Sequence, residues 1–234
     1  MPETPSVELL EPNRPVYPPG MSRGGKAPVL STLGNLALLD VPGLGFCGSR
    51  KASEKGIDVA TDCAEQAVKA GFVVISGNAA GVDLAAHHTA LARGGATILV
   101  LAEGINSFRI RRELKPVWDW DRVLVISQFP AAAVWQAYRA MERNDVIIAL
   151  SRAMIVVEAG DTGGTLAAGL RTLQVGKPLF VADYENIDEV APGNAQLLAK
   201  GAMRLRRSRE TGRANVAYLK EIAARQSPVQ PVLL

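Results

Sequence analysis

The sequence has little of what a disulfide scaffold, a zinc module or a membrane protein requires. Its 234 residues include two cysteines, Cys47 and Cys63, which give neither a disulfide framework nor a zinc-binding spacing. We expect two buried thiols in a reducing cytoplasm. No apolar run approaches the roughly 20 residues of a membrane span, and no signal-peptide pattern is present. The sequence therefore predicts a cytoplasmic protein without membrane segment, metal or cofactor.

The sequence also lacks a strong charge of either sign. Its formal net charge is +3 and its pI about 9.0, which is compatible with a nucleic-acid partner but does not require one. With 48% hydrophobic and 21% charged residues, the composition fits one globular domain. We find no tandem repeat.

The composition changes at both ends of the predicted domain, which we place at residues 29–203. Residues 1–28 are rich in proline and glycine and carry too little apolar surface to order themselves, so they predict a disordered arm. Residues 204–234 form a basic segment with a predicted terminal helix at 215–225. This segment contains a run of basic residues, Arg204, Arg206, Arg207, Arg209 and Arg213. The run is either a solvated face of the protein or an arm that binds along the phosphates of a nucleic acid.

One stretch, residues 151–177, organises the rest of the chain. Residues 154–157 form an apolar, largely β-branched run that predicts a strand buried on both faces, with Glu158 at its carboxyl end. A loop with Gly163, Gly164 and Thr165 follows, and then a segment with helical spacing of leucines. A strand, a glycine loop and a helix in this order direct free backbone N–H groups at an anion. We therefore predict a phosphate-bearing ligand over this loop.

A second strand, at residues 44–47, ends in Gly48, Ser49, Arg50 and Lys51. The G-x-G-x-x-G pattern of residues 43–48 is not a dinucleotide fingerprint, because it lies within the predicted strand and the next strand does not end in an acid. Ser53 is the expected N-cap of the helix that follows. We predict that Arg50 contacts a phosphate; Lys51 has the same position at the sheet edge but is equally well explained as a solvated charge.

A third strand, at residues 72–75, leads into Ser76, Gly77 and Gly81 and a helix that contains Asp83 and His87. Asp83 and His87 are four residues apart and share a helix face, so we predict a hydrogen bond between them that braces the loop. The helix dipole alone would also explain a carboxylate in the first turn. His87 and His88 are adjacent, so one should face inward and one outward, and they offer too few ligands for a metal site.

The remaining segments continue the alternation of strands and helices. Strands are predicted at 97–101, 122–127 and 179–182, and a short helix at 32–39. A helix at 131–142 carries Val134, Ala137, Tyr138 and Met141 on one face. Arg143 and Asn144 then lead into a helical segment at 146–150, and Arg143 is a second candidate phosphate clamp. The alternation predicts an α/β fold, a mostly parallel sheet with helices on both faces.

Residues 108–120 combine basic and aromatic side chains. Arg109, Arg111, Arg112 and Lys115 lie near Phe108, Trp118 and Trp120. Such a mixture is used by tracks for single-stranded nucleic acid. It is equally expected of a surface helix whose tryptophan packs into the core.

Six segments occur in the order seen in the DNA-processing protein A family (DprA, also called Smf), which this chain resembles from about residue 40 to 202. They are residues 48–56 (GSRKASEKG), 76–87 (SGNAAGVDLAAH), 94–104 (GGATILVLAEG), 143–151 (RNDVIIALS), 157–166 (VEAGDTGGTL) and 193–202 (GNAQLLAKGA). The resemblance implies an extended Rossmann-like domain that binds single-stranded DNA without catalysis, helps to load the RecA recombinase, and acts as a homodimer.

Carried over by position, the resemblance implies a positively charged pocket beside the glycine loops. The residues that line or shape it are Arg50, Ser76, Gly77, Gly81, Asp83, His87, Arg143, Asn144, Glu158, Gly163, Gly164 and Thr165. Lys51 and Ser49 adjoin this set. The chain departs from the family where Ala80 replaces an expected arginine and where no Tyr-Pro follows near residues 106–108. We also expect it to be without the family's helical N-terminal and winged-helix C-terminal modules.

Two other functions use the same fold. Lysine-decarboxylase-like phosphoribohydrolases carry a catalytic glutamate where this chain has Ala168, and Glu158 would replace it only by turning inward. A sensor that binds a nucleotide-derived signal without turnover would use the same phosphate loops. We rank both below a single-strand DNA-binding protein with no catalytic residue.

Overall fold

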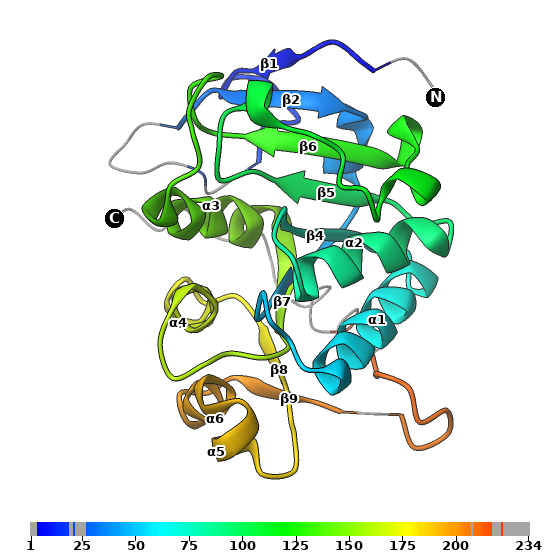
Figure 1. Cartoon of the computed structure of the whole chain (residues 1–234), viewed down its shortest axis with the longest axis vertical. Coiled ribbons are helices and arrows are strands. Elements are labelled where there is room, and N and C mark those ends of the chain that lie inside the picture. Colours follow the sequence, from blue (N-terminus) through cyan, green and yellow to red (C-terminus); the bar gives the residue numbers. More distant parts are fainter. Residues whose placement is uncertain (1–3, 19–20, 22–26, 207, 217–220, 222–234) are drawn as a thin grey trace.

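The computed structural model describes residues 4–18, 21, 27–206, 208–216 and 221. Within these residues one sheet of nine strands carries helices on both faces (Figure 1). The strands are β1 Glu8–Leu10, β2 Leu30–Gly34, β3 Gly43–Cys47, β4 Val73–Gly77, β5 Thr97–Val100, β6 Val123–Ser127, β7 Ser151–Val156, β8 Leu179–Ala182 and β9 Met203–Leu205. The α-helices are α1 Glu54–Lys69, α2 Val82–Ala92, α3 Ala137–Leu150, α4 Gly164–Gln174, α5 Ile187–Val190 and α6 Pro192–Ala199. Short 3-10 helices are η1 Leu36–Asp40, η2 Ile105–Ser107, η3 Lys115–Val117 and η4 Trp120–Arg122.

The order of the strands places a reversal in the middle of the sheet. The order is β1-β2-β6-β5-β4-β3-β7-β8-β9, and all neighbours from β6 to β9 are parallel, whereas β2 is antiparallel to both β1 and β6. From β3 the chain builds outward to β6, then returns to add β7 on the other side of β3. Ligands of open α/β sheets bind at the carboxyl ends of the strands at such a point. The predicted α/β fold is confirmed, and its switch point lies between β3 and β7.

The core lies on both faces of the parallel strands, because successive side chains of a strand point to opposite sides. Leu44 and Phe46 of β3 pack with Ala60 and Ala64 of α1 on the face that α1 and α2 cover. The other face packs against α3, α4 and α6 through Ile75, Met154, Val156, Val146, Leu166 and Leu197. Figure 1 shows these two helix layers on either side of the sheet.

The predicted disordered arm is wrong for part of residues 1–28. Residues 8–10 form β1, which pairs antiparallel with β2, and Leu10 is 1% exposed beside Leu30. The Tyr17 hydroxyl donates to the Pro28 carbonyl at 2.5 Å. Backbone pairing with a strand some 20 residues later supplies the order that local composition does not show. Residues 1–3, 19–20 and 22–26 of this segment lie outside the described residues.

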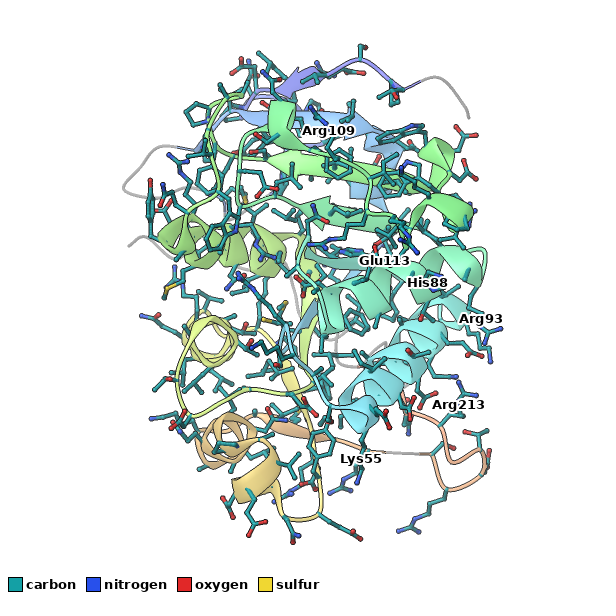
Figure 2. The ribbon with its side chains drawn as sticks, in the orientation of Figure 1. Lys55, His88, Arg93, Arg109, Glu113 and Arg213 are labelled. Carbon is teal, nitrogen blue, oxygen red and sulfur yellow. The ribbon has the colours of Figure 1, made fainter. Side chains whose placement is uncertain are left out.

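The predicted boundary at residue 203 is also wrong, because β9 crosses it and pairs with β8. Two arginines of the basic segment form ion pairs: Arg204 contacts Asp183 at 2.5 Å, and Arg213 contacts Asp62 and Glu65. Figure 2 labels Arg93 and Arg213, which reach Glu65 of α1 from two separate segments. The helix predicted at 215–225 falls largely outside the described residues.

Two predicted helices also differ. The helix expected at 32–39 is the end of β2 followed by η1. The helix expected at 131–142 begins only at Ala137, and it continues without a break to Leu150. Residues before Ala137 are held in a loop, because Ala133 N–H donates to Pro130 O and Gly104 N–H donates to Ala133 O, both at 2.8 Å.

Candidate functional site

The loop after β3 rests on the start of α2. Val82 N–H donates to Ser49 O at 3.3 Å, and a Cβ on Gly81 would lie 2.2 Å from the same oxygen. Gly81 also has φ +73°, a conformation that glycine adopts readily. Ser49 Oγ accepts from Lys51 N–H at 3.0 Å and closes the turn. The backbone is thus fixed, while the side chains of Arg50 and Lys51 are exposed.

The Arg50 guanidinium has an aromatic neighbour. Its central carbon lies 5.3 Å from the ring centroid of Trp135, a cation–π distance. Trp135 comes from the loop before α3 and is 49% exposed. The sequence did not indicate this contact, because nothing local relates two residues 85 positions apart.

The loop after β7 is tied to the loop after β3. Glu158 is 7% exposed, and its carboxylate accepts from Ser53 N–H at 2.9 Å and from the Ser53 hydroxyl. Ser53 Oγ in turn accepts from Gly56 N–H at 3.0 Å, which confirms Ser53 as the N-cap of α1. A Cβ on Gly56 would lie 2.5 Å from Glu158 Oε1, so the carboxylate approaches only because residue 56 is glycine.

Asn194 holds the same loop from behind, a role the sequence did not reveal. It is fully buried, accepts from Ala159 N–H at 2.9 Å and donates to Val157 O at 2.7 Å and Ala182 O at 2.9 Å. Gly193, whose Cβ would lie 2.1 Å from Gly160 O, was the available clue to a close contact.

The start of α4 is open. Gly163 has φ +100°, and a Cβ added at Gly163 or Gly164 would meet no described atom within 4 Å. No described side chain caps this helix, and its first turn contains no acidic residue. The first N–H groups of an 11-residue helix therefore face outward at its positive end, which favours an anion.

The loop after β4 is not open in this way. Asp83 Oδ1 accepts from the Ser76 hydroxyl at 2.8 Å, and Oδ2 accepts from Ala79 N–H at 3.2 Å. Asp83 thus occupies the Ala79 amide, in one of the glycine loops that the resemblance places beside the pocket. The structure brings Ser76 and Gly77 to the predicted edge of the sheet but bonds this loop to its own helix.

The predicted hydrogen bond between Asp83 and His87 is wrong. His87 is 1% exposed, with Nδ1 2.6 Å from Thr97 Oγ1 and Nε2 2.7 Å from Gly77 O. Because a carbonyl only accepts, Nε2 carries the proton of the neutral ring and donates to Gly77 O, while the Thr97 hydroxyl beside Nδ1 donates to Val74 O at 2.8 Å. Burial lowers the pKa of His87 to about 4, so the ring is neutral at pH 7. His88 is exposed, as expected for the second of the two histidines.

Arg143 is a buried cation at this edge. Its side chain is 9% exposed and its guanidinium lies over the backbone of Gly77, where Nη1 would be 1.5 Å from an added Cβ. Among the described residues its ion pair with Asp83 Oδ2 is long, at 3.8 Å, and its Nε has no hydrogen-bond partner. A guanidinium offers five donors, so this one has capacity for an anion.

The neighbours of Arg143 connect it to α4. Asn144 Nδ2 donates to Gly164 O at 3.4 Å. The Thr165 side chain hydrogen-bonds the Cys47 thiol, whose pKa is raised to about 12, chiefly by burial and then by the charge of Asp83. Most predicted site residues therefore converge on the carboxyl ends of β3, β4 and β7, and Arg50 and Lys51 lie on the outer loop.

The aromatic residues at 108–120 belong to the core, whereas Arg109, Arg112 and Lys115 are exposed. Phe108 and Trp120 are 7% and 8% exposed, and Trp118 packs edge-on against Trp120 at 5.1 Å. The Arg111 guanidinium donates to Asn78 O at 2.6 Å. Trp118 packs against the core as the alternative expected, but it lies between the 3-10 helices η3 and η4 and not on a surface α-helix.

No group of three or more potential metal ligands occurs among the residues that the structure describes. Over the same residues, no helix combines the length and the apolar character that crossing a bilayer requires.

A sequence model of the family described as DNA recombination-mediator protein A matches residues 8–213. The chain belongs to this family. It is 32% identical over 201 residues to the DNA processing protein DprA of Streptococcus pneumoniae, covering 85% of this chain and 70% of that protein. It is 29% identical over 203 residues to protein Smf of Synechocystis, covering 83% of this chain and half of that protein.

Solved structures of the family share the fold. The DprA structure from S. pneumoniae matches with a TM-score of 0.75 at 30% identity, covering 85% of this chain and 70% of that one. DNA processing protein A from Helicobacter pylori, described for its single-stranded DNA binding mode, matches with a TM-score of 0.76 at 23% identity, covering 92% and 96% of the two chains. These matches confirm the Rossmann-like fold and the family resemblance drawn from the six motifs.

Proposed function

We propose that this chain is a non-enzymatic DNA-processing protein whose ligand is single-stranded DNA, held at the β3–β7 switch point. Phosphates would lie on the free N–H groups of Gly163, Gly164 and Thr165 and on the guanidinium groups of Arg50 and Arg143. The observation that carries the proposal is the uncapped start of α4 beside a buried arginine that lacks a full set of acceptors.

Membership of a family of DNA recombination mediators supports a role in DNA processing and recombination. A relative of the same fold is described by its binding of single-stranded DNA, which supports the ligand. By the same resemblance we propose that the chain acts as a homodimer in the cytoplasm and helps to load RecA. The chain covers only half of the Synechocystis relative, so binding of RecA and dimer formation are proposals separate from DNA binding and require their own tests.

A phosphoribohydrolase is less well supported by the site. Ala168, at the position of its catalytic glutamate, is 2% exposed and apolar. Glu158 accepts from Ser53 N–H and the Ser53 hydroxyl, so its carboxylate is directed at α1. General acid–base chemistry needs a carboxyl within reach of the substrate, which these two residues do not offer.

The test is fluorescence anisotropy with labelled oligo-dT of 5 to 40 nucleotides between 25 and 300 mM NaCl. We expect affinity to rise with length and to fall with salt, with a log–log slope of about −0.7 for each phosphate contacted. Calorimetry with mononucleotides should give much weaker binding than with oligonucleotides. Tight binding of a mononucleotide, with no gain from length, would favour the sensor function instead, and release of a free base from a nucleoside monophosphate would favour the enzyme.

A further inference from the structure

Four large apolar side chains are exposed together next to the proposed phosphate site. They are Val134 (63%), Trp135 (49%), Tyr138 (55%) and Met141 (52%), which we call the α3 strip. Among the described residues nine large apolar side chains are exposed, and these four occupy eight consecutive positions. The sequence pattern had placed Val134, Tyr138 and Met141 on a single helix face. They are exposed because α3 begins only at Ala137 and packs against the core through its second half, with Val146, Ile147 and Ile148. Such a gathering of apolar surface marks a binding site.

The loop that carries the strip is fixed before any ligand binds. Gly104 N–H donates to Ala133 O at 2.8 Å, and Asn106 N–H donates to Ala131 O at 3.1 Å. A Cβ on Gly104 would lie 2.2 Å from the carbonyl oxygens of Pro130 and Ala131, so the two backbones touch. A side chain on a fixed loop loses little freedom on binding, which favours affinity.

Arginines alternate with the aromatic rings of the strip. The Arg139 guanidinium carbon lies 5.5 Å from the ring centroid of Tyr138 and 5.6 Å from that of Phe129. Arg50, 5.3 Å from the Trp135 ring, belongs to the loop after β3. The strip is therefore continuous, through Arg50, with the edge of the sheet where phosphates are proposed to lie.

We infer that the α3 strip is a stacking platform for the unpaired bases of the strand whose phosphates lie on Arg50, Arg143 and α4. The inference rests on the proposed function and adds to it the surface that contacts the bases of the strand, whereas the proposed site contacts its phosphates. Aromatic rings with interleaved arginines are the surface that single-strand binding proteins offer to bases, whatever their sequence. A duplex presents similar phosphates but keeps its bases stacked on one another, so the strip gives preference for single strands.

The experiment compares two ligands that differ only in their bases: a 20-nucleotide oligo-dT and an abasic tetrahydrofuran strand of the same length. The variants are Trp135→Ala, Tyr138→Ala and the two combined, and Val190→Ala is the control because Val190 is also exposed (48%) but lies in α5. We expect the combined variant to lose at least tenfold in affinity for oligo-dT and less than twofold for the abasic strand, with an unchanged salt slope.

Tryptophan fluorescence gives an independent readout of the same contact. Oligo-dT should quench the emission of the wild-type chain, and Trp135→Phe, which keeps an aromatic ring, should retain affinity but lose most of the quenching. Trp120 is buried and Trp118 packs against it, so these two tryptophans provide the unquenched background.

Three results would overturn the inference. If the combined variant binds both ligands as the wild type does, the strip does not contact DNA. If both affinities fall equally, the strip only supports Arg50. If DNA binding is unchanged but light scattering shows that self-association of the wild type is lost, the strip is a contact between copies. Failure of the wild type to bind either strand would instead remove the proposed function itself.

Discussion

The Glu158 carboxylate at the end of β7 accepts a hydrogen bond from the backbone N–H of Ser53, which lies 105 residues earlier at the start of α1, at a distance of 2.9 Å. The pair spans the switch point of the sheet. It also explains why an acid lies beside a site proposed for phosphates: the carboxylate compensates the positive end of α1 and is turned away from α4. Its role is to fix the two loops relative to each other.

Glu158→Gln should lower the free energy of unfolding by about 2 kcal/mol, since hydrogen bonds to a charged group are lost in a buried place. Urea unfolding at pH 7 measures this. Glu54→Gln is the control, because Glu54 is exposed in the first turn of the same helix. Equal stability of the Glu158 variant and the wild type would show that Ser53 caps α1 without help.

Arg50→Ala should lower the affinity for oligo-dT about tenfold or more and leave the thermal midpoint nearly unchanged, because this side chain is exposed. The salt slope should fall by about 0.7, the contribution of one phosphate on a single strand. Arg152→Ala is the matched control: Arg152 is exposed near the start of β7, at the opposite end of that strand. A comparable loss of stability in the Arg50 variant would mean that Arg50 is structural.

Arg143→Met should abolish most oligonucleotide binding yet change the free energy of unfolding by less than about 1 kcal/mol. A buried charge is costly unless fully paired, and Asp83 keeps its bonds from Ser76 and Ala79 without Arg143. Inorganic phosphate should raise the thermal midpoint of the wild type but not of the variant. Strong destabilisation without phosphate would show instead that the 3.8 Å pair with Asp83 holds the fold.

Local patterns predicted the centre of the sheet well, because β3, β4 and β7 contain short apolar runs, each followed within a few residues by glycine. The N-cap role of Ser53 could be predicted for the same reason, since the cap and its helix are adjacent in sequence. In contrast, β1 and β9 depend on pairing with distant strands, so the segments that contain them looked like arms. The loop before α3 is held by the hydrogen bond from Gly104 N–H to Ala133 O, which local sequence does not show. The contact of Arg50 with Trp135 depends on where this loop and the loop after β3 lie in the fold.

The partner of a polar side chain was the least predictable feature. Spacing placed Asp83 and His87 on one helix face, but spacing does not state which neighbouring strand each side chain meets. Asp83 reaches back to the loop after β4, while His87 lies between β4 and β5. The same limit explains why the role of Asn194, buried behind β7, was not predicted.

His87 should make stability depend on pH in a defined window. The neutral ring donates to Gly77 O and its other nitrogen lies 2.6 Å from Thr97 Oγ1, and Asp83, Arg143 and Arg111 are the charged groups around it. Burial lowers its pKa from 6.5 to about 4, so between these values the unfolded chain binds a proton that the folded chain does not. The contribution of His87 to the free energy of unfolding is therefore complete above pH 6.5 and is lost as the pH falls to 4. At about 1.4 kcal/mol per pKa unit, the loss amounts to about 3 kcal/mol.

Urea unfolding of the wild type, His87→Gln and His88→Gln at pH 7.0, 6.0, 5.0 and 4.5 isolates this contribution, because the carboxylates titrate alike in all three. The His87 variant is expected to be less stable at pH 7 and to lose less stability on acidification. The exposed His88 variant should follow the wild type throughout. If the His87 variant runs parallel to the wild type at every pH, the ring is protonated in the folded state, and both of its nitrogens donate.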